Sequence, residues 1–355
     1  MYPALAVVEA LTPSPASPGG VGVRWIGSRG GVEEELVRRA GLAFDAIPAG
    51  GVHGISPLRA GLNALRLLAG VVKSLEWAAR FRPQALLVTG GFVSVPAAVA
   101  CWLRRTPIVV YLPDVEPGLA VKFVSRLATR VAVSVDESRQ YLPAHKVVVT
   151  GYPTRSALAR IERSEAARRL EIDPGRKTLL VFGGSHGARS LNRTLAAILD
   201  TLLARYQVIH ISGTTDAAEA RARREALPED LKAGYRLFEY VHDMGAALAS
   251  ADVAVSRAGA SVLGEFPLFG LASILVPYPH AWRYQKVNAD YLASRGAALR
   301  VNDEDLARDL LPAIERLMSD DGQRARMQQQ ARSLARPDAA AQLAGVVLRL
   351  AGATP

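Results

Sequence analysis

Hydrophobic and polar positions alternate along the chain in the manner of buried strands separated by helices. In the first half, short apolar runs that end in glycine or another small residue occur at 21–28, 85–91, 108–113, 130–135 and 146–151. Helical patterns separate them, at 33–40, 60–80 and 95–104. Continuous β-branched runs that alternate with helices predict a parallel sheet covered by helices on both faces.

The same pattern starts again at residue 178. The second series of apolar runs occupies 178–184, 206–213, 236–241, 251–259, 272–279 and 297–301. Two such series in 355 residues predict an α/β protein of two Rossmann-like domains. We expect an N-terminal domain over 1–152 and a C-terminal domain over 153–336. We expect the remaining segment, 337–355, to form a helix that packs back on the N-terminal domain.

The chain opens directly on a helical pattern, ALAVVEAL, with Pro3 at a favourable first-turn position. In a doubly wound domain the first strand lies in the middle of the sheet, and the turn after it carries a phosphate-binding glycine loop. Losing a central strand would remove much of a domain's stability, which is about 5–15 kcal/mol in total. We therefore expect a strand and a glycine-rich turn just upstream, with Met1 an internal methionine or a wrongly assigned start.

Composition narrows the class of protein. The formal charge of +10 favours phosphate-rich partners, but the arginines are spread along the chain without an aromatic and basic cluster, so nucleic-acid binding is not predicted. Cys101 is the only cysteine, which excludes an internal disulfide and a cysteine zinc site and fits a reducing cytoplasm. Without an uninterrupted apolar run of about 18 residues, no transmembrane helix is predicted. The N-terminal sequence does not resemble an export signal.

The strongest candidate site is the segment TLLVFGGSHGARSLN, where a strand runs through Gly183, Gly184 and Gly187 into a helix. The backbone N–H groups of such a turn and the helix N-terminus form an anion-binding cradle. Ser185 adds a hydroxyl donor, and His186 a donor or a cation. The alternative is an ordinary tight turn, because a glycine-rich turn alone is a weak signal.

Two further segments strengthen this site. In DVAVSRAGASVLGEF a strand leads into a turn, and the helix after it carries Glu265 in its first turns. A carboxylate there can accept both ribose hydroxyls; the alternative is a glutamate favoured by the helix dipole. In VPYPHAWRYQKVNADYL, Gln285 can bind sugar hydroxyls and Asn288 can brace the loop, although each could equally be structural.

The first half repeats the strand, glycine turn and helix in LLVTGGFVSVPAAVA. Gly90 and Gly91, with Ser94, could hold a second phosphate group. A later strand ends with Asp114 and Glu116, which are candidate bases or sugar ligands. Carboxylates of a proline-containing turn are an equally good explanation.

Residues 56–82 form a basic pattern with interspersed large apolar side chains. A basic helix with tryptophan and phenylalanine can lie on an anionic membrane surface; alternatively, its apolar residues face the core. The residues concerned are Leu65, Leu68, Val72, Lys73, Trp77 and Phe81. The acidic run at 303–305 predicts helix capping rather than a metal site.

Six segments, in this order, resemble the MurG family of peripheral membrane glycosyltransferases: YPALAV, GGFVSVPA, GYPTR, GGSHGARSLN, HDM followed by SRAGASVLGE, and PHAWRYQKVNA. The resemblance covers essentially the whole chain. It implies the GT-B fold, two Rossmann-like domains facing a cleft, with no cofactor and no essential metal. It implies transfer of N-acetylglucosamine (GlcNAc) from UDP-GlcNAc to the undecaprenyl-diphosphate-linked muramoyl-pentapeptide, with inversion, at the cytoplasmic face of the plasma membrane.

The resemblance also implies roles for particular residues. The donor site would comprise Arg155, Gly183, Gly184, Ser185, His186, Gly187, Val241, Ala260, Ser261, Val262, Leu263, Gly264, Glu265 and Gln285. Within it, Val241 would meet uracil, Glu265 the ribose and Gln285 the GlcNAc hydroxyls. The acceptor would meet Gly90, Gly91, Phe92, Ser94 and Asp114.

The sequence departs from the family at several of these positions. Asp114 stands where the family's HEQN stretch has asparagine, His186 replaces the glutamine of GGSQG, and Val262 replaces a threonine. The family's proposed catalytic histidine would precede Met1, so the catalytic base is unassigned, with Asp114 as a candidate. Three alternatives therefore stay open: a GT-B transferase with another UDP-sugar or glycolipid acceptor, a UDP-GlcNAc 2-epimerase, and a non-catalytic nucleotide-sugar-binding protein.

Overall fold

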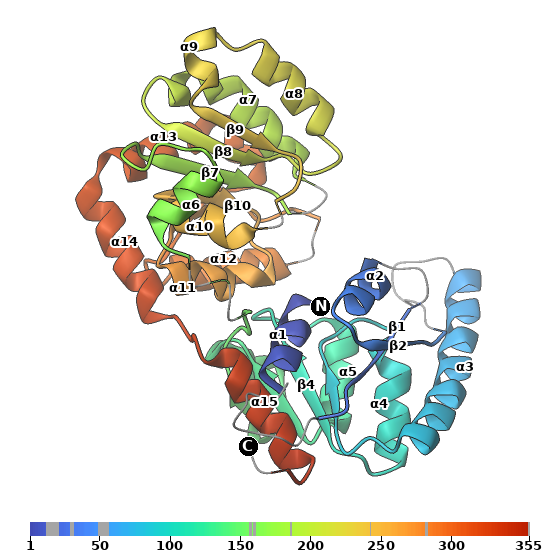
Figure 1. Cartoon of the computed structure of the whole chain (residues 1–355). Helices are drawn as coiled ribbons and strands as arrows, with labels where there is room; N and C mark the ends of the chain where they lie inside the picture. Colours follow the sequence, from blue (N-terminus) through green and yellow to red (C-terminus); the bar gives the residue numbers. More distant parts are fainter. Residues whose placement is uncertain are drawn as a thin grey trace. The chain divides into compact units, whose positions relative to one another are not determined.

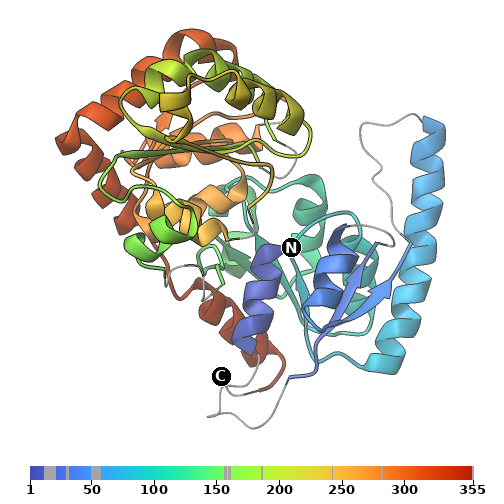
Figure 2. The same ribbon diagram turned by 45° about the horizontal axis from the view of Figure 1, so that its top comes forward.

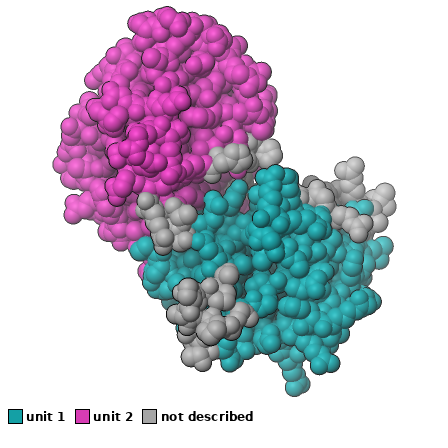
Figure 3. All heavy atoms as spheres, in the orientation of Figure 1, with its two compact units in different colours: residues 1–155, 337–355 teal, residues 156–336 magenta. Residues whose placement is uncertain are grey.

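The computed structural model describes residues 1–11, 21–28, 32–48, 57–155, 158, 161–184, 187–241, 243–280 and 283–353, without the side chains of 32, 57–62 and 64. The chain forms two compact units (Figure 3). Unit 1 comprises Met1–Arg155 and Pro337–Pro355, and unit 2 comprises Ser156–Arg336. The C-terminal segment thus belongs to the same unit as the N-terminus.

Unit 2 contains a six-stranded parallel sheet in the order β12-β11-β10-β7-β8-β9 (Figure 1). Its strands are β7 (Thr178–Phe182), β8 (Gln207–Ile211), β9 (Tyr235–Phe238), β10 (Val253–Ser256), β11 (Ala272–Leu275) and β12 (Leu299–Arg300). The strand order reverses between β7 and β10. Such a topological switch point places two turns side by side at the carboxyl edge of the sheet, where ligands bind in doubly wound folds.

Helices cover both faces of this sheet. They are α6 (Arg163–Arg169), α7 (Arg189–Leu203), α8 (Ala217–Glu225), α9 (Glu229–Lys232), α10 (Met244–Ser250), α11 (Glu265–Phe269), α12 (Tyr284–Ala293), α13 (Leu306–Ser319) and α14 (Asp321–Ser333), with 3₁₀ turns η4 (Ala260–Leu263) and η5 (Asp303–Asp305). Leu179 and Val181 of β7 belong to the core cluster that includes α7 and α13. Leu180, between them, is also fully buried. Because alternate side chains point to opposite faces, both faces of the strand are covered.

Unit 1 contains a four-stranded parallel sheet, β3-β4-β5-β6, and a separate parallel pair, β1-β2. The strands are β1 (Arg24–Gly27), β2 (Ala43–Ala46), β3 (Leu86–Val88), β4 (Ile108–Leu112), β5 (Arg130–Val133) and β6 (Val147–Val149). The helices are α1 (Tyr2–Leu11), α2 (Val32–Arg39), α3 (Pro57–Phe81), α4 (Ser94–Leu103), α5 (Leu119–Leu127) and α15 (Ala339–Leu350), with 3₁₀ turns η1 (Asp136–Tyr141) and η2 (Ala144–Lys146).

Two apolar layers enclose the larger sheet of unit 1. On one side, Val110 and Val131 pack with side chains of α4 and α5. On the other, Val109 and Tyr111 pack with α1 and α15. Figures 1 and 2 both show α1 and α15 side by side, although they come from opposite ends of the chain. The buried apolar stripe of α15 therefore completes the core of unit 1.

The α/β fold class and the parallel sheets predicted from the sequence are confirmed. A strand contains or overlaps each predicted apolar run; β9 starts one residue before its run. The prediction omitted β2, because Ala43–Ala46 is short, includes Asp45 and is at most half-buried. The prediction of capping at 303–305 was wrong: Asn302 and Asp305, the N-cap residues of η5 and α13, make no side-chain cap hydrogen bond.

Candidate functional site

The predicted donor residues of unit 2 gather where β7, β10 and β11 end. Phe182, the last residue of β7, pairs with Ser256, the last residue of β10. Ser256 also pairs with Leu275, the last residue of β11. The three turns that follow these strands therefore start at the same level of one sheet edge. Gly183, Arg257 and Val276 are the first residues beyond it.

The glycine turn after β7 requires glycine at two positions. Gly187 has φ +84°, and a Cβ built on it would lie 2.3 Å from the Ser212 carbonyl oxygen. A Cβ on Gly183 would lie 2.3 Å from the Ala188 Cβ. Gly184 has φ +99°, and a Cβ on it would have no atom of the described residues within 4 Å beyond its chain neighbours. The turn is thus packed against the protein at Gly183 and Gly187 and accessible at Gly184, a geometry that lets backbone approach an anion.

The helix after this turn contributes its N-terminus. Ala188 is the N-cap residue of α7 and makes no side-chain cap hydrogen bond. Backbone N–H groups in the first turn of a helix point outward along its axis and favour negative charge. Ser185 and His186 lie outside the described residues.

A buried arginine that the sequence interpretation did not single out links the turns. Arg257, 9% exposed, donates from Nη1 to Asp303 Oδ1 at 2.5 Å and from Nη2 to Ser190 Oγ at 2.8 Å. Ser190 Oγ in turn donates to Asp303 Oδ1 at 2.7 Å. The Arg257 guanidinium also lies over the Tyr278 ring, 5.3 Å from its centroid. Arg257 therefore connects the β10 turn to the first turn of α7.

Hydrogen bonds also hold the segments after β10 and β11 together. The buried amide of Asn288 donates to the Ala258 carbonyl oxygen at 3.1 Å, which braces the β10 turn. Gln285 Oε1 accepts from the Tyr278 backbone N–H at 2.9 Å. Because Oε1 is engaged in this way, the Nε2 amino group is the end of Gln285 that can donate to a ligand.

The remaining predicted donor residues differ in accessibility. Glu265 begins α11 and is half-buried, as are Ala260, Ser261 and Gly264. Val262 and Leu263 are buried, so only their backbone could reach a ligand. Val241 is half-buried in the segment before α10. Arg155 belongs to unit 1, where its exposed guanidinium lies over the Tyr2 ring.

A buried polar network supports the glycine turn from beneath. Asn192 Nδ2 donates to the Ser212 carbonyl oxygen and to Asp216 Oδ2, each at 2.8 Å. The Oδ1 of Asn192 therefore accepts from His210 Nε2–H at 3.0 Å, and His210 Nδ1 accepts from the Tyr235 hydroxyl at 2.6 Å. Burial lowers the pKa of His210 to about 4, so the imidazole is neutral. The same Ser212 carbonyl limits the space at Gly187.

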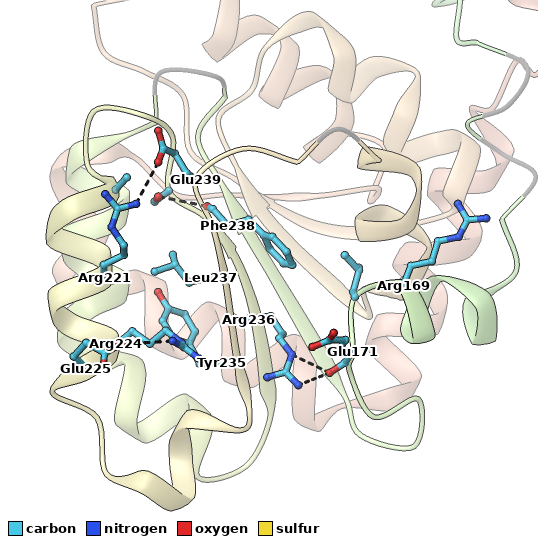
Figure 4. A pocket seen from close by; sticks show the side chains of 13 residues that line it. Arg169, Glu171, Arg221, Arg224, Glu225, Tyr235, Arg236, Leu237, Phe238 and Glu239 are labelled. Carbon is cyan, nitrogen blue, oxygen red and sulfur yellow. Dashed lines mark hydrogen bonds and ion pairs between the residues drawn. The ribbon is translucent and has the colours of Figure 1, made fainter.

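A cavity of about 480 Å³ lies beside β9. Among the described residues that line it, none belongs to the predicted donor site. Figure 4 shows Arg221 directed at Glu239 and Arg236 at the Glu171 backbone. Arg224 pairs with Glu225. Because these guanidinium groups already contact carboxylates or carbonyls, the cavity is less suited to an anionic ligand than the switch point.

In unit 1, the predicted acceptor residues also share a sheet edge. Gly90 and Gly91 follow β3, and Asp114 follows the neighbouring strand β4, with which β3 pairs in parallel. Gly90 has φ +110° and Gly91 φ +81°. Ser94 Oγ donates to the Gly91 carbonyl oxygen at 2.7 Å. The Ser94 hydroxyl thus stabilises the turn, and Phe92 lies half-buried within it.

The six predicted membrane residues divide into two groups on α3. Leu65, Leu68 and Val72 are 64%, 63% and 59% exposed and, at spacings of three and four, share one helix face. Lys73 is also exposed. Trp77 and Phe81 instead pack toward β1 and β2, where Trp77 Nε1 donates to Asp45 Oδ2 at 2.9 Å.

The described residues lack two kinds of feature. None of their helices combines the length and apolar character needed to span a membrane. Their histidine, cysteine and carboxylate side chains form no group of three or more that could hold a metal ion.

Comparison with known families defines the class of protein. Residues 1–133 match the N-terminal domain of glycosyltransferase family 28, and residues 178–343 match the C-terminal domain of that family. With the parallel α/β architecture of both units, these matches define a glycosyltransferase with the GT-B fold.

Full-length relatives define the family more narrowly. The UDP-N-acetylglucosamine–N-acetylmuramyl-(pentapeptide) pyrophosphoryl-undecaprenol N-acetylglucosamine transferase of Roseiflexus sp. (strain RS-1) is 41% identical, with 97% of this chain and 91% of that protein covered. The transferase of the same name from Bacillus subtilis (strain 168) is 31% identical, with 99% and 96% covered. The chain belongs to this family, the MurG transferases.

Solved structures agree in fold. The MurG of Acinetobacter baumannii superimposes with a TM-score of 0.76 at 23% identity, covering 98% of this chain and 95% of that one. A UDP-GlcNAc 2-epimerase from Neisseria meningitidis, bound to UDP-GlcNAc, gives 0.65 at 12% identity, with 98% of both chains covered. The fold is therefore common to transferases and epimerases, and sequence similarity is what separates them.

Proposed function

We propose that this protein transfers GlcNAc from UDP-GlcNAc to the undecaprenyl-diphosphate-linked muramoyl-pentapeptide, with inversion at the anomeric carbon, in peptidoglycan synthesis. The observation that carries the proposal is the similarity, over almost the full length of both chains, to transferases of that name. The glycine turns and helix N-termini at the sheet edges suit a reaction with a diphosphate leaving group.

We assign the donor to the switch point of unit 2. The backbone amides of the turn at 183–187 and of the first turn of α7 would bind the diphosphate and stabilise the charge that develops as UDP leaves. Glu265 would accept both ribose hydroxyls, and the backbone near Val241 would meet uracil. Gln285 would donate from Nε2 to a GlcNAc hydroxyl.

We assign the lipid-linked acceptor to unit 1. Because the Ser94 hydroxyl donates to Gly91, the backbone amides of Gly90, Gly91 and Phe92 are the better donors for the acceptor diphosphate. Asp114 would contact the acceptor sugar or deprotonate its attacking hydroxyl. These two roles of Asp114 can be distinguished by replacing it, because loss of a catalytic base changes the pH dependence of kcat, whereas loss of a sugar ligand does not.

We further propose that the protein acts as a peripheral enzyme at the cytoplasmic face of the plasma membrane. The exposed Leu65, Leu68 and Val72 form an apolar stripe with Lys73 next to it. Such a helix face can insert between lipid headgroups while its cations contact anionic lipid. Trp102 and Leu103, at the end of α4, are also exposed, and α4 packs against α3.

A transfer assay tests the reaction. Purified protein is incubated with labelled UDP-GlcNAc and a short-chain analogue of the lipid-linked acceptor, and the disaccharide product is measured. UDP-glucose and UDP-N-acetylgalactosamine compete in parallel reactions, and a reaction without acceptor detects epimerisation. Efficient use of another sugar, or turnover without acceptor, would contradict the proposal.

Vesicle flotation tests the membrane role. Replacing Leu65, Leu68 and Val72 together with serine should reduce binding to vesicles containing anionic lipid at least about tenfold, because several apolar side chains no longer insert. Replacing Leu119 and Phe123, exposed apolar residues of α5, provides a control elsewhere on unit 1. Unchanged flotation of the triple variant would refute the assignment of α3.

A further inference from the structure

The sheet of unit 2 ends at β9. Among the described residues, β9 pairs only with β8, so its second edge is open. The carbonyl oxygens of Gly234 and Phe238 both accept hydrogen bonds from the β8 side. Because backbone groups alternate in direction along a strand, the N–H and C=O groups of Tyr235 and Leu237 point away from β8. Such an edge can pair with a further strand.

The cavity beside β9 lies along this open edge. Side chains of neighbouring strand residues point to opposite faces of a sheet, yet Arg236 and Leu237 both line this one cavity. The helix α8 contributes Arg221 and Arg224 on one side of β9, and the segment after α6 contributes Glu171 on the other (Figure 4). The edge of β9 therefore forms the floor of a groove of about 480 Å³ with a wall on each side.

The groove carries more positive than negative side chains. Among the described residues that line it, four are arginines and three are glutamates. Arg221 pairs with Glu239, and Arg224 with Glu225, but all four side chains are exposed. Exposed ion pairs contribute little to stability, so a carboxylate brought by a ligand can replace those of the protein.

Arg236 is the arginine of the groove whose charge is least balanced. Its guanidinium donates to the backbone carbonyl oxygens of Glu171 and Ala233. Among the described residues, no carboxylate forms an ion pair with it. Because Arg236 belongs to β9 itself, a strand paired with β9 would place a side chain next to this guanidinium.

Charge favours an acidic segment over a second copy of this chain. Antiparallel pairing of β9 with β9 of another copy would bring the two α8 helices together across a two-fold axis. Arg221 and Arg224 would then face the same residues of the other copy, and like charges repel. A small anion, in turn, offers no backbone groups to the open edge. An extended segment with carboxylates on both of its faces satisfies the backbone groups and the arginines together.

We propose that this groove binds an extended acidic segment of a partner protein, which pairs with the open edge of β9 as an added strand and places carboxylates against Arg224 on one face and Arg236 on the other. Backbone hydrogen bonds supply affinity that does not depend on sequence, and the arginines select acidic side chains. This inference does not depend on the transferase activity.

Three peptides test the pairing by calorimetric titration at low ionic strength. One is acetyl-Glu-Val-Glu-Glu-Val-Glu-amide, and one has lysine in place of every glutamate. The third is the acidic peptide N-methylated at its third and fourth amides, which removes a donor from each of its edges. The acidic peptide should bind at least about tenfold more tightly than either control. It should also slow amide hydrogen exchange in β9 at least about tenfold.

The proposal would be overturned if the acidic peptide did not bind, or if either control bound as tightly. Equal binding of the N-methylated peptide would show that charge alone is sufficient. Equal binding of the lysine peptide would show that the arginines do not select the ligand.

Leu237→Pro tests the edge from the side of the protein. Proline at this position removes a donor that points away from β8, and edge strands tolerate proline there. Binding of the acidic peptide should weaken at least about tenfold, while Tm changes by no more than about 5 °C. The matched control, Leu237→Ala, keeps the donor and should bind the peptide as the unmodified chain does. Equal peptide affinity of the two variants would contradict strand pairing, and the N-methylated peptide makes the same test without changing the protein.

Charge variants test the selection of acidic side chains. Arg224→Gln and Arg236→Gln should each weaken binding of the acidic peptide by about three- to tenfold, because each removes a charged donor. Arg205→Gln removes an exposed arginine of unit 2 that does not line the groove, so it should bind the peptide unchanged. If the double variant of Arg224 and Arg236 bound as tightly as Arg205→Gln, the acidic partner would be refuted.

Sedimentation of the protein alone tests the second copy as the occupant. The chain should not self-associate through β9, because the arginines of two copies would meet. A dimer that Leu237→Pro dissociated would show that another copy occupies this edge, and would overturn the proposal.

Discussion

The glycine at position 187 provides the sharpest test of how the donor turn is built. In Gly187→Ala, the new methyl group would lie 2.3 Å from the Ser212 carbonyl oxygen, at a residue whose φ is +84°. The positive φ alone costs about 1–2 kcal/mol in an alanine. The close contact with backbone adds about 1–3 kcal/mol, because the loop must shift. The free energy of unfolding of unit 2 should therefore fall by about 2–5 kcal/mol.

The matched control is Gly184→Ala. Gly184 also has a positive φ, +99°, but among the described residues, its chain neighbours aside, no atom lies within 4 Å of the position that its new methyl group would take. In Gly184→Ala, the free energy of unfolding should fall only by the backbone strain of about 1–2 kcal/mol. Because the methyl group points into the space that we assign to the diphosphate, UDP affinity should fall disproportionately.

Thermal unfolding and calorimetric UDP titration measure both effects. Gly187→Ala should lower Tm by about 5–15 °C and Gly184→Ala by about half as much or less. If the two variants lost the same stability, contact with the Ser212 carbonyl would not be what requires glycine at 187. If Gly184→Ala bound UDP as tightly as the unmodified protein, the diphosphate would not approach that turn.

Three further predictions follow from single residues. Glu265→Ala should weaken UDP binding by several-fold to about 100-fold, with Glu265→Gln intermediate, because each removes a charged acceptor for the ribose hydroxyls; unchanged UDP affinity in a titration would refute that role. The pKa of His210 lies at about 4 in the folded protein, below the unfolded value of about 6.5. As the pH falls, the unfolded chain therefore takes up the proton at a higher pH than the folded protein does. The free energy of unfolding that is present above pH 6.5 should decline by up to about 3 kcal/mol as the pH falls toward 4. Urea unfolding at several pH values checks this decline, which should be shallower in His210→Gln. Arg257→Met should lower stability by about 3–5 kcal/mol by leaving Asp303 without its buried cation; a double-mutant cycle with Asp303→Asn should recover much of that loss, and strict additivity would contradict the coupling.

Much of the fold follows from local sequence. Runs such as TLLVF and DVAVS predict buried parallel strands because their side chains are apolar on both faces, and β7 and β10 form there. Glycines that follow a strand predict tight turns into helices, as found at Gly90 and Gly184. The expected helix after Pro337 forms as α15. These features depend on neighbouring residues only, so the pattern along the chain is sufficient.

Tertiary structure decided which polar side chains act together. Sequence suggested that Asp303 caps a helix, but Arg257 and Ser190, 46 and 113 positions away, bind it instead. Nothing local marks Arg257 as buried, because the low dielectric and the paired carboxylate that hold it arise only when three segments meet. Tertiary structure likewise separated Trp77 and Phe81 from the exposed apolar stripe of α3. Local sequence was sufficient to predict the strands other than β2, the glycine turns and α15. The polar contacts among them depended on long-range packing, because they join residues that only folding brings together.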